Sequence, residues 1–480
     1  MSTSKGDRSV KAHVGKDDLI TALREIVGPS GMLEGDDVQA RYPGYFMDRI
    51  AATVIVRPAS TEEVSRVMAL CNEHGQAVVT QGGMSGWVRG TQTEPDDLIL
   101  SLERMHAIEE IDPVNRTVTV QAGVILQTLQ EAVERFQLVF PLDLGGRGSC
   151  QLGGNASTNA GGLRVIRYGM MRQLVLGVEA VMADGTVVSS LNKMIKNNAG
   201  YDIKQLFLGT EGTLGIVTRL VLRLYEQPLS SNSCMVALTD FTKVADFLRF
   251  MDRSLGGMLS AFEVLDRDFY TINTAAGRHR PPLDGSYPYF VLLESLGYDQ
   301  ERDAQHFENI LNHALEQGLI EDAVLPRSEA ERESLWAIRE DLEHILTDIK
   351  PFQAFDVSLP IGTMEAYMAE VRTLVSSRWP SSKICFLGHV GDGNLHIAIG
   401  SGSDRSADIR AVEECVYQPL QSVGGSVSAE HGIGLEKKDF LQISRSATEI
   451  DLMRRLKTTL DPKSILNPGK VFDITGEGVR

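Results

Sequence analysis

Glycine-rich blocks crowd the first half of this chain and constrain its fold more than any other feature. They are Gln81 to Gly86, Gly145 to Ser149, Gly153 to Gly162 and Gly209 to Gly215. Such long runs of small residues let the backbone pack against a large flat ligand, such as a dinucleotide or a flavin. The first block follows an expected strand, so its backbone N–H groups could converge on a pyrophosphate. It matches neither Gly-x-Gly-x-x-Gly nor the Walker pattern, which disfavours the common nucleotide-binding folds.

Length and composition indicate a globular protein of several domains. A chain of 480 residues exceeds the size of a single core, so two or three domains are expected. No apolar stretch is long enough to be a transmembrane segment. The formal charge of -17, without a basic cluster, argues against a nucleic-acid partner. Five scattered cysteines indicate a reducing compartment, so a cytoplasmic location is expected.

The N-terminal residues 1–20 contain no apolar core region and are expected to form a short flexible tail. Asp7, Asp17 and Asp18 argue against an organellar transit peptide. Further on, a helix is predicted from Thr61 to His74, opened by Ser60 and Glu63 at capping-box spacing. Because strand-like runs flank this helix at 53–56 and 77–80, we predict a βαβ unit with two parallel strands and a right-handed crossover.

The second half of the chain has a different pattern. After Pro228 the glycine density falls, and amphipathic helices are predicted at 242–255, 301–317 and 328–349. A second, α+β domain is therefore expected. On the last of these helices, Arg339 and Glu343 lie four residues apart and could form an ordinary ion pair along the surface.

A histidine hairpin is predicted near the C-terminal end. Strand-like runs at 383–387 and 395–399 flank a glycine turn, so His389 and His396 would lie on neighbouring strands with Cβ atoms about 5 Å apart. Two imidazoles with a carboxylate such as Glu430 suit zinc, manganese or ferrous iron. His431 would point away from Glu430 if the chain is extended there. On their own, His389 and His396 fit a polar hairpin equally well, and the set also fits a non-haem iron oxygenase.

The glycine blocks also carry a family resemblance, in the runs 141–145, 148–150, 153–155, 158–164, 167–169 and 200–215. These resemble the PCMH-type FAD domain of the vanillyl-alcohol-oxidase superfamily. Within it, the chain is most similar to the branch of D-2-hydroxyglutarate dehydrogenases, D-lactate dehydrogenases and the glycolate oxidase flavin subunit. The resemblance implies an α+β fold: an FAD domain of two α+β subdomains (21–226), an α+β substrate or cap domain with a large antiparallel sheet carrying the metal hairpin (227–425), and a segment returning to the FAD domain (426–480).

The same resemblance implies roles for individual residues. His431 matches the catalytic base, and Arg339 matches the residue that holds the substrate carboxylate. The expected metal ligands are His389, His396 and Glu430, with zinc preferred over manganese or iron. The first glycine loop lacks the histidine that tethers FAD in some relatives, so non-covalent FAD is expected. The cofactor-binding residues implied are Pro58, Gln81, Gly82, Gly83, Met84, Ser85, Gly86, Gly148, Ser149, Gly153, Gly154, Thr158, Asn159, Gly162, Gly215, Ile216, Val217 and Asn467.

Three departures from the hydroxyglutarate enzymes bear on the substrate. Glu343 stands where they have a threonine, Ala354 replaces a lysine, and Ala398 replaces an asparagine. Loss of a cation and gain of a carboxylate disfavour a dicarboxylate. We therefore expect an FAD-dependent dehydrogenase for a D-2-hydroxy acid with a neutral side chain, such as D-lactate. D-2-hydroxyglutarate and a non-catalytic flavin subunit are the alternatives. An electron acceptor (quinone, electron-transfer flavoprotein or cytochrome) is the expected partner, and a homodimer is one possible assembly.

Overall fold

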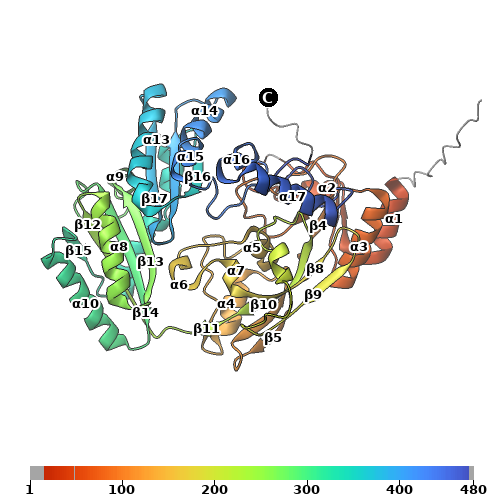
Figure 1. Cartoon of the computed structure of the whole chain (residues 1–480), viewed down its shortest axis with the longest axis horizontal. Coiled ribbons are helices and arrows are strands. Elements are labelled where there is room, and N and C mark those ends of the chain that lie inside the picture. The colour runs from red at the N-terminus through yellow and green to blue at the C-terminus, as the bar shows by residue number, and fades with distance from the viewer. Residues whose placement is uncertain (1–15, 48, 475–480) are drawn as a thin grey trace, which may run out of the picture.

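The first part of the chain forms two small sheets. The computed structural model describes residues 16–47 and 49–474 (Figure 1). The four-stranded sheet has the order β1 (Met32–Glu34), β2 (Val54–Val56), β4 (Leu98–Ser101) and β3 (Val78–Gln81). The five-stranded antiparallel sheet has the order β5 (Ile108–Asp112), β6 (Thr117–Gln121), β10 (Ile216–Arg223), β8 (Val175–Val181) and β9 (Val187–Ser190).

The predicted βαβ unit is present in altered form. Helix α3 (Thr61–His74) has the predicted bounds, and the Ser60 hydroxyl accepts a hydrogen bond from the Glu63 N–H. The Glu63 carboxylate accepts from the N–H of Ala59 rather than from that of Ser60, so the capping box is incomplete. Strands β2 and β3 are both parallel to β4, which lies between them. The two predicted strands therefore run in the same direction but are not neighbours.

The predicted tail is shorter than residues 1–20. Helix α1 (Lys16–Val27) begins within it, because Leu19, Leu23 and Val27 pack into the same core as α3. Residues 1–15 lie outside the described part of the chain. Within the described residues, no helix is both long and apolar enough to cross a membrane.

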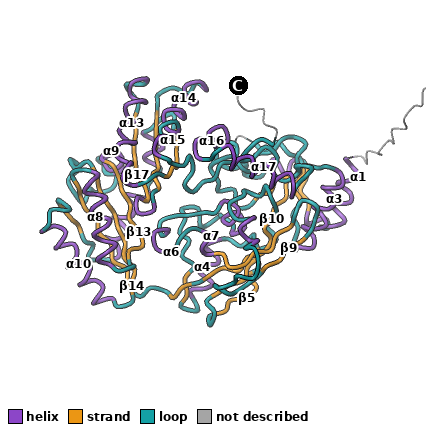
Figure 2. The backbone as a smooth tube through the Cα atoms, viewed as in Figure 1, coloured by secondary structure: helices purple, strands orange, loops and turns teal. Residues whose placement is uncertain are grey.

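The second half is built on a large antiparallel sheet, as expected. Figure 2 shows this sheet on one side of the molecule and the two smaller sheets on the other. Helices α8 (Phe241–Leu255), α10 (Gln300–Glu316), α13 (Met364–Arg378) and α14 (Ser406–Tyr417) contribute to the core on one face. On the other face lie α9 (Arg267–Asn273), α11 (Glu329–Glu340) and α12 (Glu343–Asp348). The strand order is β15 (Asp322–Val324), β12 (Ser230–Leu238), β14 (Tyr289–Gly297), β13 (Leu259–Asp266), β17 (Lys383–His389), β18 (Asn394–Gly400) and β16 (Gln353–Ser358).

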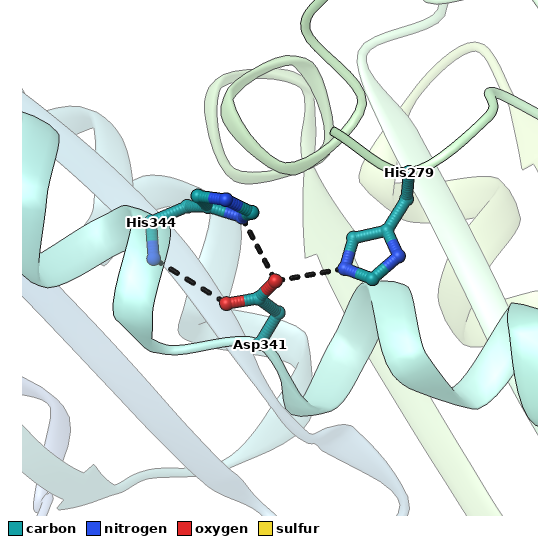
Figure 3. Close-up of side chains that lie close together, drawn as sticks. All are labelled: His279, Asp341 and His344. Carbon is teal, nitrogen blue, oxygen red and sulfur yellow. Dashed lines mark hydrogen bonds and ion pairs between the residues drawn. The ribbon is translucent and has the colours of Figure 1, made fainter. Parts of the chain in front are cut away.

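The prediction of a single helix at 328–349 is wrong. The chain leaves the helix at Asp341, where ψ is 93°, and begins α12 at Glu343. The Asp341 Oδ1 atom accepts hydrogen bonds from the N–H groups of Glu343 and His344, and Figure 3 shows the one from His344. A side chain that satisfies these N–H groups competes with continuation of the helix. The break also removes the predicted ion pair of Arg339 with Glu343, because the two residues no longer lie on one helix.

The C-terminal segment packs back against the first half. Beyond α17 (Ala447–Leu460), the Val78 N–H of β3 donates to Ile465 O at 2.7 Å, and the Asn467 N–H donates to Val78 O at 2.9 Å. The buried Lys457 Nζ donates to Thr213 O, Leu466 O and the Asp461 carboxylate. These contacts connect the last part of the chain to the glycine block at 209–215.

Candidate functional site

The two histidines of the hairpin lie on one face of the large sheet. In β18, His396 pairs with Leu387 of β17, so His389 lies diagonally across from it rather than directly opposite. Residues two apart on a strand share a face, which places both imidazoles on the side covered by α9, α11 and α12. Their ring centroids are 5.2 Å apart. The predicted proximity is therefore present, with a register that differs by two residues because Leu387 rather than His389 is opposite His396.

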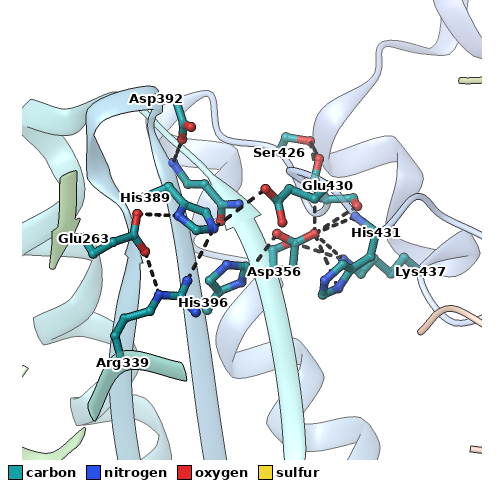
Figure 4. A network of polar contacts seen from close by, with 12 residues as sticks. Glu263, Arg339, Asp356, His389, Asp392, His396, Ser426, Glu430, His431 and Lys437 are labelled. Atoms are coloured by element: carbon teal, nitrogen blue, oxygen red, sulfur yellow. Dashed lines mark hydrogen bonds and ion pairs between the residues drawn. The ribbon is translucent and has the colours of Figure 1, made fainter. Parts of the chain in front are cut away.

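A buried carboxylate orients His389. Glu263 of β13 is directly opposite it, fully buried, with Oε1 2.6 Å from His389 Nδ1 (Figure 4). When Nδ1–H donates to Glu263, Nε2 presents its lone pair to the opposite side of the ring. The other oxygen of Glu263 accepts a hydrogen bond from Arg339 Nε at 2.8 Å. Burial by itself would raise the pKa of Glu263, but the protonated, metal-free form of His389 and the adjacent Arg339 lower it to about 2.

Glu430 is brought to the histidines from a loop after α15 (Leu420–Val423). Its Oε1 lies 3.8 Å from His389 Nε2. One ligand atom from each of His389, His396 and Glu430 lies within 4.8 Å of the others. This is a mixed nitrogen and oxygen set that suits a divalent cation. Asn394, two residues before His396 in β18, is buried, and both polar atoms of its side chain lack a hydrogen-bond partner. The residues therefore fit a bound ion.

Asp356 of β16 positions this loop. Its Oδ2 accepts hydrogen bonds from the backbone N–H groups of both Glu430 and His431, each at 2.9 Å. Lys437 Nζ lies 3.6 Å from the same oxygen. Burial opposes ionisation of Asp356, but the adjacent His431, Lys437 and His396 lower its pKa below the ordinary range. Asp356, Glu430 and His431 also form a group with metal-ligand spacing. Asp356 Oδ1 has no hydrogen-bond partner, so this carboxylate could also face an ion, but the set with His389 and His396 offers two imidazoles rather than one and suits a zinc-type ion better.

His431 lies beside this cluster. Its ring centroid is 6.1 Å from that of His396, with the rings nearly parallel, and 5.4 Å from Trp87. Burial lowers the pKa of His431, which favours the neutral imidazole that can accept a proton. The prediction that Glu430 and His431 point to opposite sides is wrong, because the segment is a bend and both side chains reach the neighbourhood of Asp356.

The glycine blocks of the first half contain both tightly packed glycines and glycines that border open space. A Cβ atom at Gly83 would lie 2.0 Å from Ser149 O, and one at Gly162 would lie 1.9 Å from Asp143 O. In contrast, a Cβ atom on Gly86, Gly145 or Gly154 would meet nothing within 4 Å. Three buried polar atoms beside these blocks lack a partner, namely Thr80 Oγ1, Gln151 Oε1 and Asn155 Oδ1. Close-packed backbone next to open space and free acceptors fits a large polar cofactor.

Sequence comparison identifies both halves. Residues 52–190 match the family described as FAD binding domain, and residues 227–471 match the family described as FAD linked oxidases, C-terminal domain. The mitochondrial D-2-hydroxyglutarate dehydrogenase of Bos taurus is 37% identical over 461 residues, covering 96% of this chain and 84% of that protein. The D-2-hydroxyglutarate dehydrogenase of Xanthomonas citri pv. viticola is 39% identical, covering 87% of this chain and 89% of that protein.

The chain belongs to the FAD-linked oxidase family.

Solved structures support the fold of this FAD-linked oxidase. A p-cresol methylhydroxylase with substrate bound has a TM-score of 0.75 at 15% identity, covering 95% of this chain and 97% of that one. An alkyldihydroxyacetonephosphate synthase has a TM-score of 0.73 at 17% identity, covering 95% and 85%. The predicted superfamily, the α+β architecture with its large antiparallel sheet and the class of FAD-dependent dehydrogenase are thus confirmed.

The predicted FAD residues occupy different environments in this family member. Gln81 ends β3 and is buried, Met84 adopts a positive φ of 56°, and Ile216 and Val217 are buried at the start of β10. Asn467 accepts from the Thr80 N–H at 2.9 Å and donates to Glu211 O at 2.6 Å. The Asn467 side chain therefore holds protein segments together, whereas Gly86 and Gly154 border open space.

Several residues of the site did not stand out in the sequence. Glu263 and Asp356 are buried carboxylates that contact an expected ligand or its backbone, and the buried Lys437 donates to Asp356 O. Glu211 accepts hydrogen bonds from the N–H groups of Ile433 and Gly434, and so connects the loop after His431 to a glycine block. The available signal was a carboxylate flanked on both sides by apolar residues within a strand, as at Glu263 between Phe262 and Val264.

Proposed function

We propose that this protein catalyses the FAD-dependent, metal-assisted oxidation of a D-2-hydroxy acid to the 2-oxo acid. The observation that carries the proposal is the cluster of His389, His396 and Glu430, with ligand atoms within 4.8 Å of one another, beside the half-buried His431. The names of the relatives, D-2-hydroxyglutarate dehydrogenases, support the class of substrate.

The residues of the chain would divide the work as follows. Arg339 binds the carboxylate of the substrate through Nη1, since Glu263 engages its Nε and its Nη2 lies 3.5 Å from His389 Nε2. His431 takes the proton of the C2 hydroxyl as that carbon becomes a carbonyl. The ion held by His389, His396 and Glu430, zinc in preference to manganese or iron, would lower the pKa of that hydroxyl. Bound FAD would accept the hydride from C2.

Two alanines support a neutral substrate side chain, as in D-lactate. Ala354 of β16 is directly opposite Ala398 of β18, two pairs along from the Asp356 and His396 pair. All four side chains share the face of the sheet that carries the cluster. Two of the three departures from the hydroxyglutarate enzymes thus combine into a single apolar contact. Glu343 contributes nothing to this argument, because it is exposed at the start of α12.

D-2-hydroxyglutarate itself is the second candidate, because relatives of that name are 34–39% identical over most of the chain. Anaerobic mixing of the yellow holoenzyme with each acid at low concentration separates the candidates. Faster flavin bleaching by D-lactate supports the proposed preference, whereas faster bleaching by D-2-hydroxyglutarate contradicts it. The variant His431→Ala should retain FAD and lose bleaching, and bleaching at an undiminished rate would contradict the role of the base.

The remaining parts of the proposal concern the environment of the enzyme. Electrons would leave the reduced flavin to a quinone, an electron-transfer flavoprotein or a cytochrome, and FAD would be bound non-covalently. The five cysteines are all free and buried, which fits the expected cytoplasmic location.

A further inference from the structure

A second group of metal-ligating side chains lies away from the proposed active-site cluster. His279 Nε2 and His344 Nδ1 each lie 2.8 Å from the Oδ2 atom of Asp341 (Figure 3). One ligand atom from each residue lies within 4.8 Å of the others. The three side chains are 28%, 31% and 18% exposed, in the order named, so an ion can enter from solvent and retain water ligands.

The hydrogen bonds of this group are incomplete without an ion. The Oδ1 atom of Asp341 is engaged by the N–H groups of Glu343 and His344, so Oδ2, which is hydrogen-bonded only to His279 Nε2, is the atom that could serve as a ligand. His344 Nδ1 is a buried atom close to Oδ2, yet it makes no hydrogen bond of acceptable direction. A buried polar atom without a partner is unfavourable, and a cation between the ring and the carboxylate would satisfy it.

The ligands come from two segments that an ion would join. His279 lies in the loop after α9, whereas Asp341 and His344 lie at the break between α11 and α12. Asn273 already joins these segments, because its Nδ2 donates to Ile338 O and Asp341 O. Arg339 precedes Asp341 by two residues, so any constraint on the end of α11 also constrains the backbone from which the Arg339 side chain extends.

We propose that His279, Asp341 and His344 bind a second divalent ion of the zinc, nickel or copper class, which holds the end of α11 in place. Two imidazoles and one carboxylate oxygen, with open positions for water, suit these ions better than magnesium or calcium. The site itself is independent of the proposed function. Its consequence for substrate binding rests on the role proposed for Arg339.

The test counts zinc in the full-length holoenzyme after equilibration with Zn2+ and removal of excess, by elemental analysis. His279→Gln and His344→Gln should each lower the content by one ion per chain relative to wild type, whether or not the active-site cluster is loaded. His313→Gln is the matched control, because His313 is exposed beside a single carboxylate, Glu316. The pair His389→Ala and His396→Ala should remove a different ion, which distinguishes the two sites.

A second measurement tests the link to Arg339. His279→Gln should raise KM for the 2-hydroxy acid and leave kcat unchanged, since a looser arginine weakens ground-state binding. Zinc should also raise the Tm of the wild type more than that of His279→Gln. Unchanged zinc content in both His279→Gln and His344→Gln would overturn the site. Loss of an ion with an unchanged KM would overturn its link to substrate binding.

Discussion

His389 Nδ1 lies 2.6 Å from Oε1 of the fully buried Glu263. A carboxylate behind a metal-ligating imidazole fixes its tautomer and raises its basicity. In this protein the same carboxylate also holds the guanidinium proposed to bind substrate, so Glu263 joins the two binding functions of the site.

Glu263→Gln tests this link, because it keeps the size of the side chain and removes its charge. Loss of such a partner typically weakens metal binding about 10- to 100-fold. We expect zinc affinity to fall by that amount and KM for substrate to rise, measured by competition with a chelator and by steady-state kinetics. Glu294→Gln is the matched control, since it is a buried strand carboxylate that pairs with Arg164 instead. Equal zinc affinity in Glu263→Gln and wild type would contradict the role of Glu263.

Asp356→Asn should impair catalysis without loss of FAD. The carboxylate accepts hydrogen bonds from the N–H groups of Glu430 and His431. An amide can turn its NH2 group toward these donors, and the hydrogen bonds are then lost. We expect kcat to fall by about tenfold or more, because one misplaced hydrogen bond at a site costs about 1–3 kcal/mol. Ser428→Ala is the control, because the Ser428 hydroxyl makes only a weak hydrogen bond to the same oxygen, at a distance of 3.4 Å. A variant with wild-type kcat would show that Asp356 does not position the loop.

Ala354→Lys should shift substrate preference toward D-2-hydroxyglutarate. A lysine at this position would add a cation to the sheet face that carries His396 and Ala398. The ratio of kcat/KM for D-2-hydroxyglutarate to that for D-lactate should rise by about tenfold or more, since a partner for a buried carboxylate contributes at least about 1.4 kcal/mol. Ala354→Met adds length without charge and should not raise this ratio. An unchanged ratio in Ala354→Lys would place the substrate side chain elsewhere.

Lys457→Met should destabilise the fold rather than the chemistry. Lys457 is buried, and its Nζ donates to Thr213 O, Leu466 O and the carboxylate of Asp461. Removing one partner of a buried ion pair costs about 3–5 kcal/mol. The Tm of the holoenzyme should fall by several degrees, whereas Lys463→Met, at an exposed site, should change it little. A Tm equal to that of wild type would mean that these contacts do not hold the C-terminal segment.

Much of the fold and of the site could be predicted from the sequence alone. The signals were the glycine runs, the helix periodicity and the histidine hairpin. Helix α3 has the predicted bounds because its cap, apolar stripe and terminal Gly75 are all local signals. Strands β17 and β18 form the predicted hairpin, because a short turn joins two apolar runs, but the register that places Leu387 opposite His396 was not predicted.

Only the tertiary structure decided the insertion of β4 between β2 and β3, the break of the helix at Asp341 and the pairing of Glu263 with His389. Each depends on contacts between segments far apart in the chain. Glu263 and His389 are 126 residues apart, and nothing local to either residue identifies the other. The free energy of burying a charged group with its partner is a property of the assembled core, so it has no signature in a single segment.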